Sequence, residues 1–170
     1  MTPTEFVTTV LDPSILWCEA VPGWHVPFDD RARVLLTAIP GQESNWVDRL
    51  QKEHGPAHSL YQFERLGGIQ GVLTHPATVV LAKKACAALG VPADSTHVWG
   101  IMATPMGDNL AVAFARLLLW SDARPLPHVG DEEASWDYYQ ENWRPGRPSR
   151  ERWTHVYPQA VAAIKSEQKE

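Results

Sequence analysis

The sequence predicts a mainly α-helical domain, α+β overall, with a small loop-and-strand insertion after a helix that ends near Glu43. Apolar residues recur at helical spacing in several segments, and capping or helix-breaking residues bound most of them. Residues 53–75 differ, because glycine is frequent there and polar and apolar residues alternate. No strand is followed by a glycine-rich turn and a helix, so the sequence does not predict a dinucleotide-binding fold.

The composition indicates one globular domain that spans residues 1–170 and can bury a single core. A net charge of -5 argues against nucleic acid as the main partner. The longest apolar runs fall far short of the roughly 18 residues that a membrane span needs, so no membrane span is predicted. The two cysteines, Cys18 and Cys86, are too few for a disulfide framework and are expected to be buried thiols.

Three helical segments are predicted in the first quarter of the chain. Thr2 can cap the first of them, and Pro3 occupies its first helical position. A second apolar segment at residues 15–20 is ended by a Pro-Gly pair. An aspartate of the pair Asp29-Asp30 then provides the N-cap of a third helix, whose apolar residues continue to Ile39.

The end of this third helix carries the first candidate functional residue, Glu43. Pro40 and Gly41 are expected to bend the helix, because proline removes a hydrogen-bond donor and crowds the preceding turn. Glu43 would then lie near the negative end of the helix dipole and among apolar neighbours, and both effects raise the pKa of a carboxyl. A raised pKa suits a general acid that works near neutral pH. The alternative interpretation is a solvated carboxylate at a helix end.

The insertion at residues 53–75 is predicted to consist of loops around one or two short strands. Strand geometry over residues 60–64 would place Tyr61 and Phe63 on one face, with Gln62 and Glu64 on the other. The polar face is directed either at a cleft or at the outer surface of a hairpin, and the sequence leaves both interpretations open.

The rest of the chain is predicted to be helical apart from turns, with helices at residues 76–89, 110–120, 132–142 and 149–164. The seven histidines are scattered and no His-Glu-x-x-His pattern occurs, so no metal or other cofactor is predicted. Ser44 lacks the His/Asp set that would make it a nucleophile. Of the eight tryptophans, Trp46 and Trp143 lie beside polar segments and are the best candidates for stacking on a sugar ring.

Three segments in this order resemble motifs of the lysozyme-like superfamily, most closely those of soluble lytic transglycosylases and goose-type lysozymes, including phage members. Residues 38–44 read Ala-Ile-Pro-Gly-Gln-Glu-Ser, which is similar to the Ala-x-x-x-x-Glu-Ser end of the family's catalytic helix. Residues 59–62 align with a Gly-Leu-Met-Gln segment, and residues 139–146 align loosely, with an insertion, with a Tyr-Asn-Ala-Gly segment. Asn109 resembles the Asn that opens the helix between these motifs.

Some positions depart from the family pattern. Ser59 and Tyr61 replace its Gly and Met, and Pro40 precedes the position of the catalytic glutamate. These departures keep an alternative open, in which a lysozyme-like domain is a non-catalytic binding or structural part of a phage particle.

The resemblance implies cleavage of the β-1,4 bond between N-acetylmuramic acid and N-acetylglucosamine in peptidoglycan. Glu43 would protonate the leaving oxygen and then act as a base. In a lytic transglycosylase it deprotonates the 6-hydroxyl of the sugar and gives a 1,6-anhydro product. In an inverting, goose-type-like hydrolase, Glu64 would be the second catalytic residue and would position water. The residues expected to bind substrate are Ser44, Trp46, Tyr61, Gln62, Tyr138, Tyr139 and Trp143.

The expected partners are therefore peptidoglycan glycan strands. The amino terminus lacks a basic segment followed by an apolar core, so no secretory signal is predicted. Synthesis in a host cytoplasm would require a holin, a virion or a lysis event to reach the cell wall. This route is typical of a phage endolysin or a virion-associated protein, with lysis-cassette or virion proteins as further partners.

Overall fold

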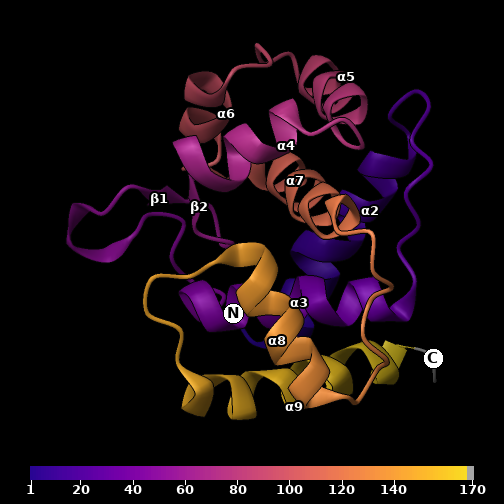
Figure 1. Cartoon of the computed structure of the whole chain (residues 1–170), viewed down its shortest axis with the longest axis vertical. Coiled ribbons are helices and arrows are strands. Elements are labelled where there is room, and N and C mark those ends of the chain that lie inside the picture. The colour runs from indigo at the N-terminus through magenta and orange to yellow at the C-terminus, as the bar shows by residue number, and fades with distance from the viewer. Residues whose placement is uncertain (168–170) are drawn as a thin grey trace.

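Helix α3 (Asp30–Ser44) carries Glu43 in the computed structural model, which describes residues 1–167 (Figure 1). It packs along α9 (Arg150–Glu167) and also contacts α7 (Asp108–Ser121) and α8 (Glu132–Trp143). Eleven of its fifteen residues are buried. A helix that is buried on nearly all sides belongs to the core. Glu43 lies in its last turn, at the edge of the core.

The other elements are shorter. They are α1 (Pro3–Phe6), the π-helical stretch η1 (Val7–Leu11), α2 (Asp12–Glu19), the 3-10 turn η2 (Lys52–His54), β1 (Ala57–His58), β2 (Phe63–Glu64), the π-helical stretch η3 (Arg65–Ile69), α4 (Gln70–Thr74), α5 (Val79–Leu89), α6 (Ser95–Ile101) and the 3-10 turn η4 (Pro105–Gly107). The predicted mainly α-helical class is confirmed. Within residues 1–167, no helix combines the length and the apolar character needed to cross a membrane.

Helix α3 begins where the sequence predicts. The Asp29 side chain accepts a hydrogen bond from the Ala32 backbone N–H at 2.9 Å, which satisfies one of the free donors of the first turn. The helix ends at Asn45, which adopts the left-handed conformation (φ 53°) that asparagine tolerates at this position. The helical assignment runs through Pro40 without interruption, and Glu43 lies in the last turn of the helix.

Two buried aromatic side chains donate hydrogen bonds to carbonyls of α3 in the turn before Pro40. A proline at position 40 leaves the carbonyl of Leu36 without its helical donor. The hydroxyl of Tyr61 replaces this donor, at 2.8 Å from the Leu36 oxygen. The indole N–H of Trp46 likewise donates to the Thr37 carbonyl at 2.8 Å.

Gly41 makes room for the ring of Trp46. A Cβ at position 41 would lie 2.3 Å from a ring carbon of Trp46, which is far too close for any larger residue. The Trp46 side chain is 4% exposed and belongs to the core. The Trp46 ring therefore packs directly against Gly41, and the Tyr61 hydroxyl replaces the donor that Pro40 lacks.

The insertion forms a small antiparallel hairpin that pairs Ala57 with Glu64 and His58 with Phe63. One or two short strands were predicted here, and this is confirmed. The strand character expected for residues 60–62 is wrong, because residues 59–62 form the turn, closed by the Gln62 N–H on the Ser59 carbonyl at 3.0 Å. The predicted division of faces holds, since Tyr61 and Phe63 are buried whereas Gln62 and Glu64 are not.

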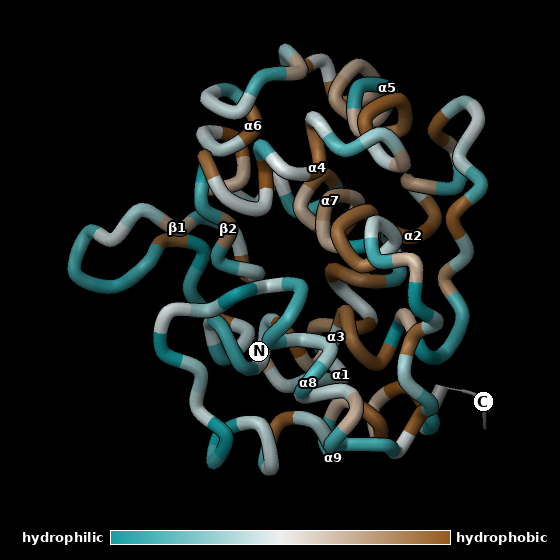
Figure 2. Tube along the Cα trace, viewed as in Figure 1, coloured by the Kyte–Doolittle hydropathy of each residue, from teal (hydrophilic) through white to brown (hydrophobic). Residues whose placement is uncertain are grey.

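Two long-range contacts fix the parts of the chain that surround α3. The Arg49 guanidinium donates two hydrogen bonds to Asp108, at 2.8 and 2.6 Å, and so ties the segment after α3 to the first turn of α7. The indole of Trp143, at the end of α8, donates to the Tyr61 carbonyl at 3.1 Å. Figure 2 shows apolar residues concentrated along α7, whereas the hairpin loop and the connection from α8 to α9 are hydrophilic.

Candidate functional site

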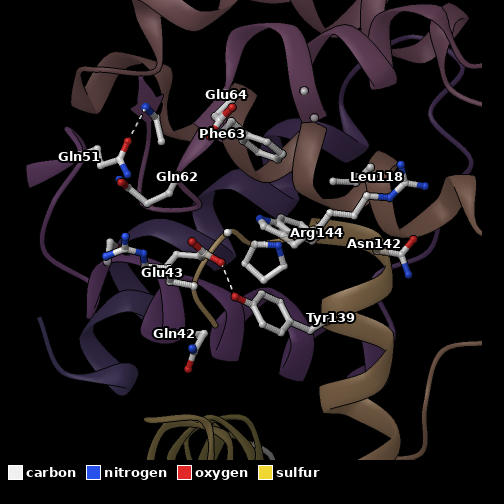
Figure 3. A pocket seen from close by; sticks show the side chains of 18 of the residues that line it. Gln42, Glu43, Gln51, Gln62, Phe63, Glu64, Leu118, Tyr139, Asn142 and Arg144 are labelled. Carbon is white, nitrogen blue, oxygen red and sulfur yellow. Dashed lines mark hydrogen bonds between the residues drawn. The ribbon is translucent and has the colours of Figure 1, made fainter. Parts of the chain in front are cut away.

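A cavity of about 1180 Å³ opens beside the last turn of α3. Its walls come from that turn, the hairpin, the end of α8 and the segment that leads into α9 (Figure 3). Of the predicted site residues, the cavity wall includes Glu43, Ser44, Gln62, Glu64, Tyr139 and Trp143. The structure thus brings together residues from three segments that are far apart in the sequence.

The carboxyl group of Glu43 is largely buried at the edge of this cavity. Its Oε1 accepts a hydrogen bond of 2.5 Å from the Tyr139 hydroxyl, drawn in Figure 3. Burial raises the pKa of Glu43 from 4.5 to about 7, against the opposing effects of the Tyr139 hydrogen bond and the Arg152 charge. Near neutral pH a large fraction of Glu43 therefore carries a proton, and the group can act as an acid and then as a base.

Tyr139 is held rigidly behind Glu43. Its side chain is 1% exposed and its ring stacks on Trp153, with ring centroids 5.1 Å apart. Burial, together with the nearby Glu43 carboxylate, holds the pKa of Tyr139 well above its ordinary value. The hydroxyl consequently stays protonated and remains a hydrogen-bond donor to Glu43.

Arg152 belongs to the site, although the sequence did not single it out. It lies in the first turns of α9 and its Nη1 donates to the Gln42 backbone carbonyl at 2.9 Å. Its charge lowers the pKa of Glu43 and opposes the effect of burial. No local sequence pattern marks this arginine, because its place beside Glu43 depends on the packing of α9 against α3.

Glu64 lies on the cavity wall at the end of β2. The sequence left open whether Glu64 faces a cleft or instead faces solvent or pairs with Arg65. The Arg65 side chain instead donates to the Thr96 hydroxyl at 3.3 Å. Glu64 is an exposed carboxylate on the same cavity as Glu43.

Ser44 and Gln62 line the cavity but also hold its walls together. The Ser44 hydroxyl is within hydrogen-bonding distance of the Leu60 carbonyl (2.7 Å) and the Pro40 carbonyl, which joins the end of α3 to the hairpin turn. The Gln62 amide donates to the carbonyls of Asp48 and Ser59 at 3.1 and 2.8 Å. Both residues therefore shape the cleft, whatever they contact in a complex.

Three residues predicted to bind substrate lie in the core and are absent from the cavity wall: Trp46, Tyr61 and Tyr138. The polar groups of Trp46 and Tyr61 are used by α3, as described above, and the Tyr138 hydroxyl donates to the Leu119 carbonyl at 2.9 Å. Their expected role is corrected from substrate contact to support of the backbone. Trp143 is the one predicted tryptophan that lines the cavity, where its ring lies 5.5 Å from that of Phe63.

A second cavity of about 560 Å³ continues the first along the hairpin. The two cavities share wall residues, among them Leu50, Gln51 and Glu64. The stacked rings of His58 and Trp99, 3.7 Å apart, contribute to the wall of the second cavity. The two cavities therefore adjoin at the hairpin.

The described part of the chain holds no group of three or more His, Cys, Asp or Glu side chains placed to share a metal ion. Comparison with known proteins gave no match to a protein-family model, to a curated protein or to a solved structure.

Proposed function

We propose that this chain is a peptidoglycan-cleaving glycosidase that acts on the β-1,4 bond between N-acetylmuramic acid and N-acetylglucosamine, as a lytic transglycosylase. The observation that carries the proposal is the state of Glu43, a carboxyl with a pKa of about 7 that accepts a hydrogen bond from Tyr139 on the wall of a large cavity. The ordered resemblance to lysozyme-like motifs supports it, as does the position of Glu43 at the end of a buried helix. On this proposal the fold is lysozyme-like and the protein serves phage lysis or a phage virion.

Glu43 would supply both proton transfers of the reaction. Its protonated form donates the proton to the glycosidic oxygen while the bond from that oxygen to C1 breaks, and positive charge develops on the sugar ring. The carboxylate then takes the proton of the sugar's own C6 hydroxyl, whose oxygen bonds to C1. The product is a 1,6-anhydro sugar, and no water is consumed. The Tyr139 hydroxyl stabilises the carboxylate formed between the two steps.

Glu64 supports a second candidate, an inverting hydrolase. An inverting enzyme needs a second carboxylate that activates water on the far side of the sugar ring. Glu64 is a carboxylate on the wall of the same cavity, and it is contributed by the hairpin. In this version water attacks C1 and the product is a reducing sugar.

The test measures release of soluble muropeptides from purified sacculi. Wild type is expected to release them, and Glu43→Gln to lose about 100- to 10,000-fold in rate, because general acid–base catalysis contributes about that much. The control is Glu151→Gln, which removes an exposed carboxylate from α9 and should retain full activity.

Mass spectrometry of the products separates the candidates. Anhydro ends support the transglycosylase, whereas reducing ends without anhydro sugar overturn it in favour of the hydrolase. Equal behaviour of wild type and Glu43→Gln would contradict both and leave a non-catalytic domain of a phage particle.

A further inference from the structure

The connection between α8 and α9, residues 144–149, forms one wall of the cavity and carries two arginines, Arg144 and Arg147. Both line the cavity that contains Glu43. Figure 3 shows Arg144 near Leu118 and Asn142. The same wall also carries the basic side chains of Lys52 and Arg152 and the acidic side chains of Glu43, Asp48, Glu64 and Glu141.

Neither arginine has an ion-pair or hydrogen-bond partner for its side chain among the residues that the structure describes. The acidic side chains next to this connection are engaged with other arginines, whereas Glu64 on the hairpin wall is exposed. Arg150 pairs with Glu132 and Glu133, and Arg124 pairs with Glu141. The guanidinium groups of Arg144 and Arg147 are thus available to a molecule in the cleft.

The segment that carries the two arginines is held at both ends. Trp143 is bonded to the Tyr61 carbonyl at one end, and Arg150 is paired with Glu133 at 2.5 Å at the other. Pro145 and Pro148 further restrict the backbone between them, because proline fixes φ. Binding to an ordered segment loses less conformational entropy than binding to a free loop.

We propose that Arg144 and Arg147 bind a carboxylate carried by the substrate beside the sugar on which Glu43 acts. This inference rests on the proposed function and narrows its substrate class. A guanidinium matches a carboxylate in shape and charge and can donate two parallel hydrogen bonds to it. Peptidoglycan strands carry carboxylates on the lactyl ether of the muramic acid or on its stem peptide, whereas chitin-type strands are neutral. The cleft therefore selects acidic, muramic-acid-containing strands over neutral polymers of N-acetylglucosamine.

The test measures binding in the Glu43→Gln background, so that ligands are not cleaved. Three tetrasaccharides are compared: one bearing stem peptides, one stripped of peptide so that its lactyl carboxylates are free, and neutral chitotetraose. The double variant Arg144→Gln/Arg147→Gln is expected to weaken binding of a carboxylate-bearing ligand about 10- to 100-fold, the usual range for hydrogen bonds to a charged group. Binding of chitotetraose should not change.

The matched control, Lys83→Gln/Lys165→Gln, removes two exposed positive charges outside both cavities and should leave all three affinities unchanged. Loss confined to the peptide-bearing ligand assigns the carboxylate to the stem peptide, and loss confined to the stripped ligand assigns it to the lactyl group. Equal losses for all three ligands, or no loss beyond the control, overturn the inference. Muropeptide release by the wild type decides the proposed function separately, so the two can fail independently.

Discussion

Glu43 illustrates how opposing effects on one carboxyl group determine a working pH. Burial stabilises the protonated form, while the Tyr139 hydroxyl and the Arg152 charge stabilise the carboxylate. The result is a pKa of about 7, which lets the same group donate a proton and then accept one. Because catalysis begins with the protonated acid, activity should decline as the pH rises through this pKa.

The hydrogen bond from Tyr139 offers a test at this scale. Tyr139→Phe removes a group that stabilises the carboxylate, so the pKa of Glu43 should rise and the alkaline limb of kcat/KM should move to higher pH. A shift of about one to two pH units is expected, since a hydrogen bond to a charged group contributes about 1.5–3 kcal/mol and one pH unit corresponds to about 1.4 kcal/mol.

Tyr138→Phe is the matched control for this shift. Tyr138 is the neighbouring tyrosine, but its hydroxyl donates to the Leu119 carbonyl and lies outside the cavity. The alkaline limb of kcat/KM for Tyr138→Phe should coincide with that of the wild type. A limb that stays in place in Tyr139→Phe, or one that moves equally in both variants, would contradict the assignment of Glu43 as the acid.

At the scale of one element, α3 shows that a helix can retain an internal proline when another segment supplies the missing donor. The Leu36 carbonyl receives the Tyr61 hydroxyl in place of a backbone N–H at position 40. Tyr61→Phe should therefore destabilise the protein by about 1–3 kcal/mol, the cost of leaving a buried acceptor unpaired.

A double-mutant cycle isolates this cause. In the Pro40→Ala background the backbone N–H of residue 40 can bond to Leu36, so Tyr61→Phe should cost clearly less than it does beside Pro40. Urea unfolding of the four proteins measures the difference. The same cost in both backgrounds would show that the Tyr61 hydroxyl acts in some other way.

The elements that could be predicted from sequence are those with local causes. The aspartate cap of α3 was predicted from the residues directly around it. The burial pattern around Phe63 was predicted from the alternation of apolar and polar residues. The aromatic residues were harder, because sequence does not show which donors are used by backbone carbonyls. Trp46 and Tyr61 were therefore predicted to bind substrate, although they support α3.

The contacts of Glu43 could be predicted only in part. Its burial follows from the apolar run before it, but Arg152 approaches from a helix that begins more than 100 residues later. Tyr139 was placed in the site by the resemblance, without its hydrogen-bond partner being fixed. Such pairs form through packing of α3 with α8 and α9, which local patterns do not encode.

For the whole molecule, the raised pKa of Glu43 links its function to stability. The folded protein binds a proton at Glu43 more tightly than the unfolded chain does, so stability should fall as the pH rises from about 4.5 to about 7. A shift from 4.5 to about 7 corresponds to a loss of about 3 kcal/mol above that window.

Glu43→Gln removes this pH-dependent loss of stability, because an amide does not ionise. The variant should be more stable than wild type by about 1–3 kcal/mol at pH 8 and nearly equal to it at pH 4. Urea unfolding at the two pH values measures the difference, with Glu151→Gln as the exposed control. A stability gain that is the same at both pH values would argue against a buried, shifted carboxyl.

The pairing of Pro40 with Tyr61 also has a consequence for how such sequences diverge. The Tyr61 hydroxyl serves the carbonyl that Pro40 leaves unpaired, so a proline at position 40 depends on a donor at position 61. Descendants of a common ancestor should therefore inherit or lose them together, and a proline at position 40 without a hydroxyl donor at position 61 should be rare.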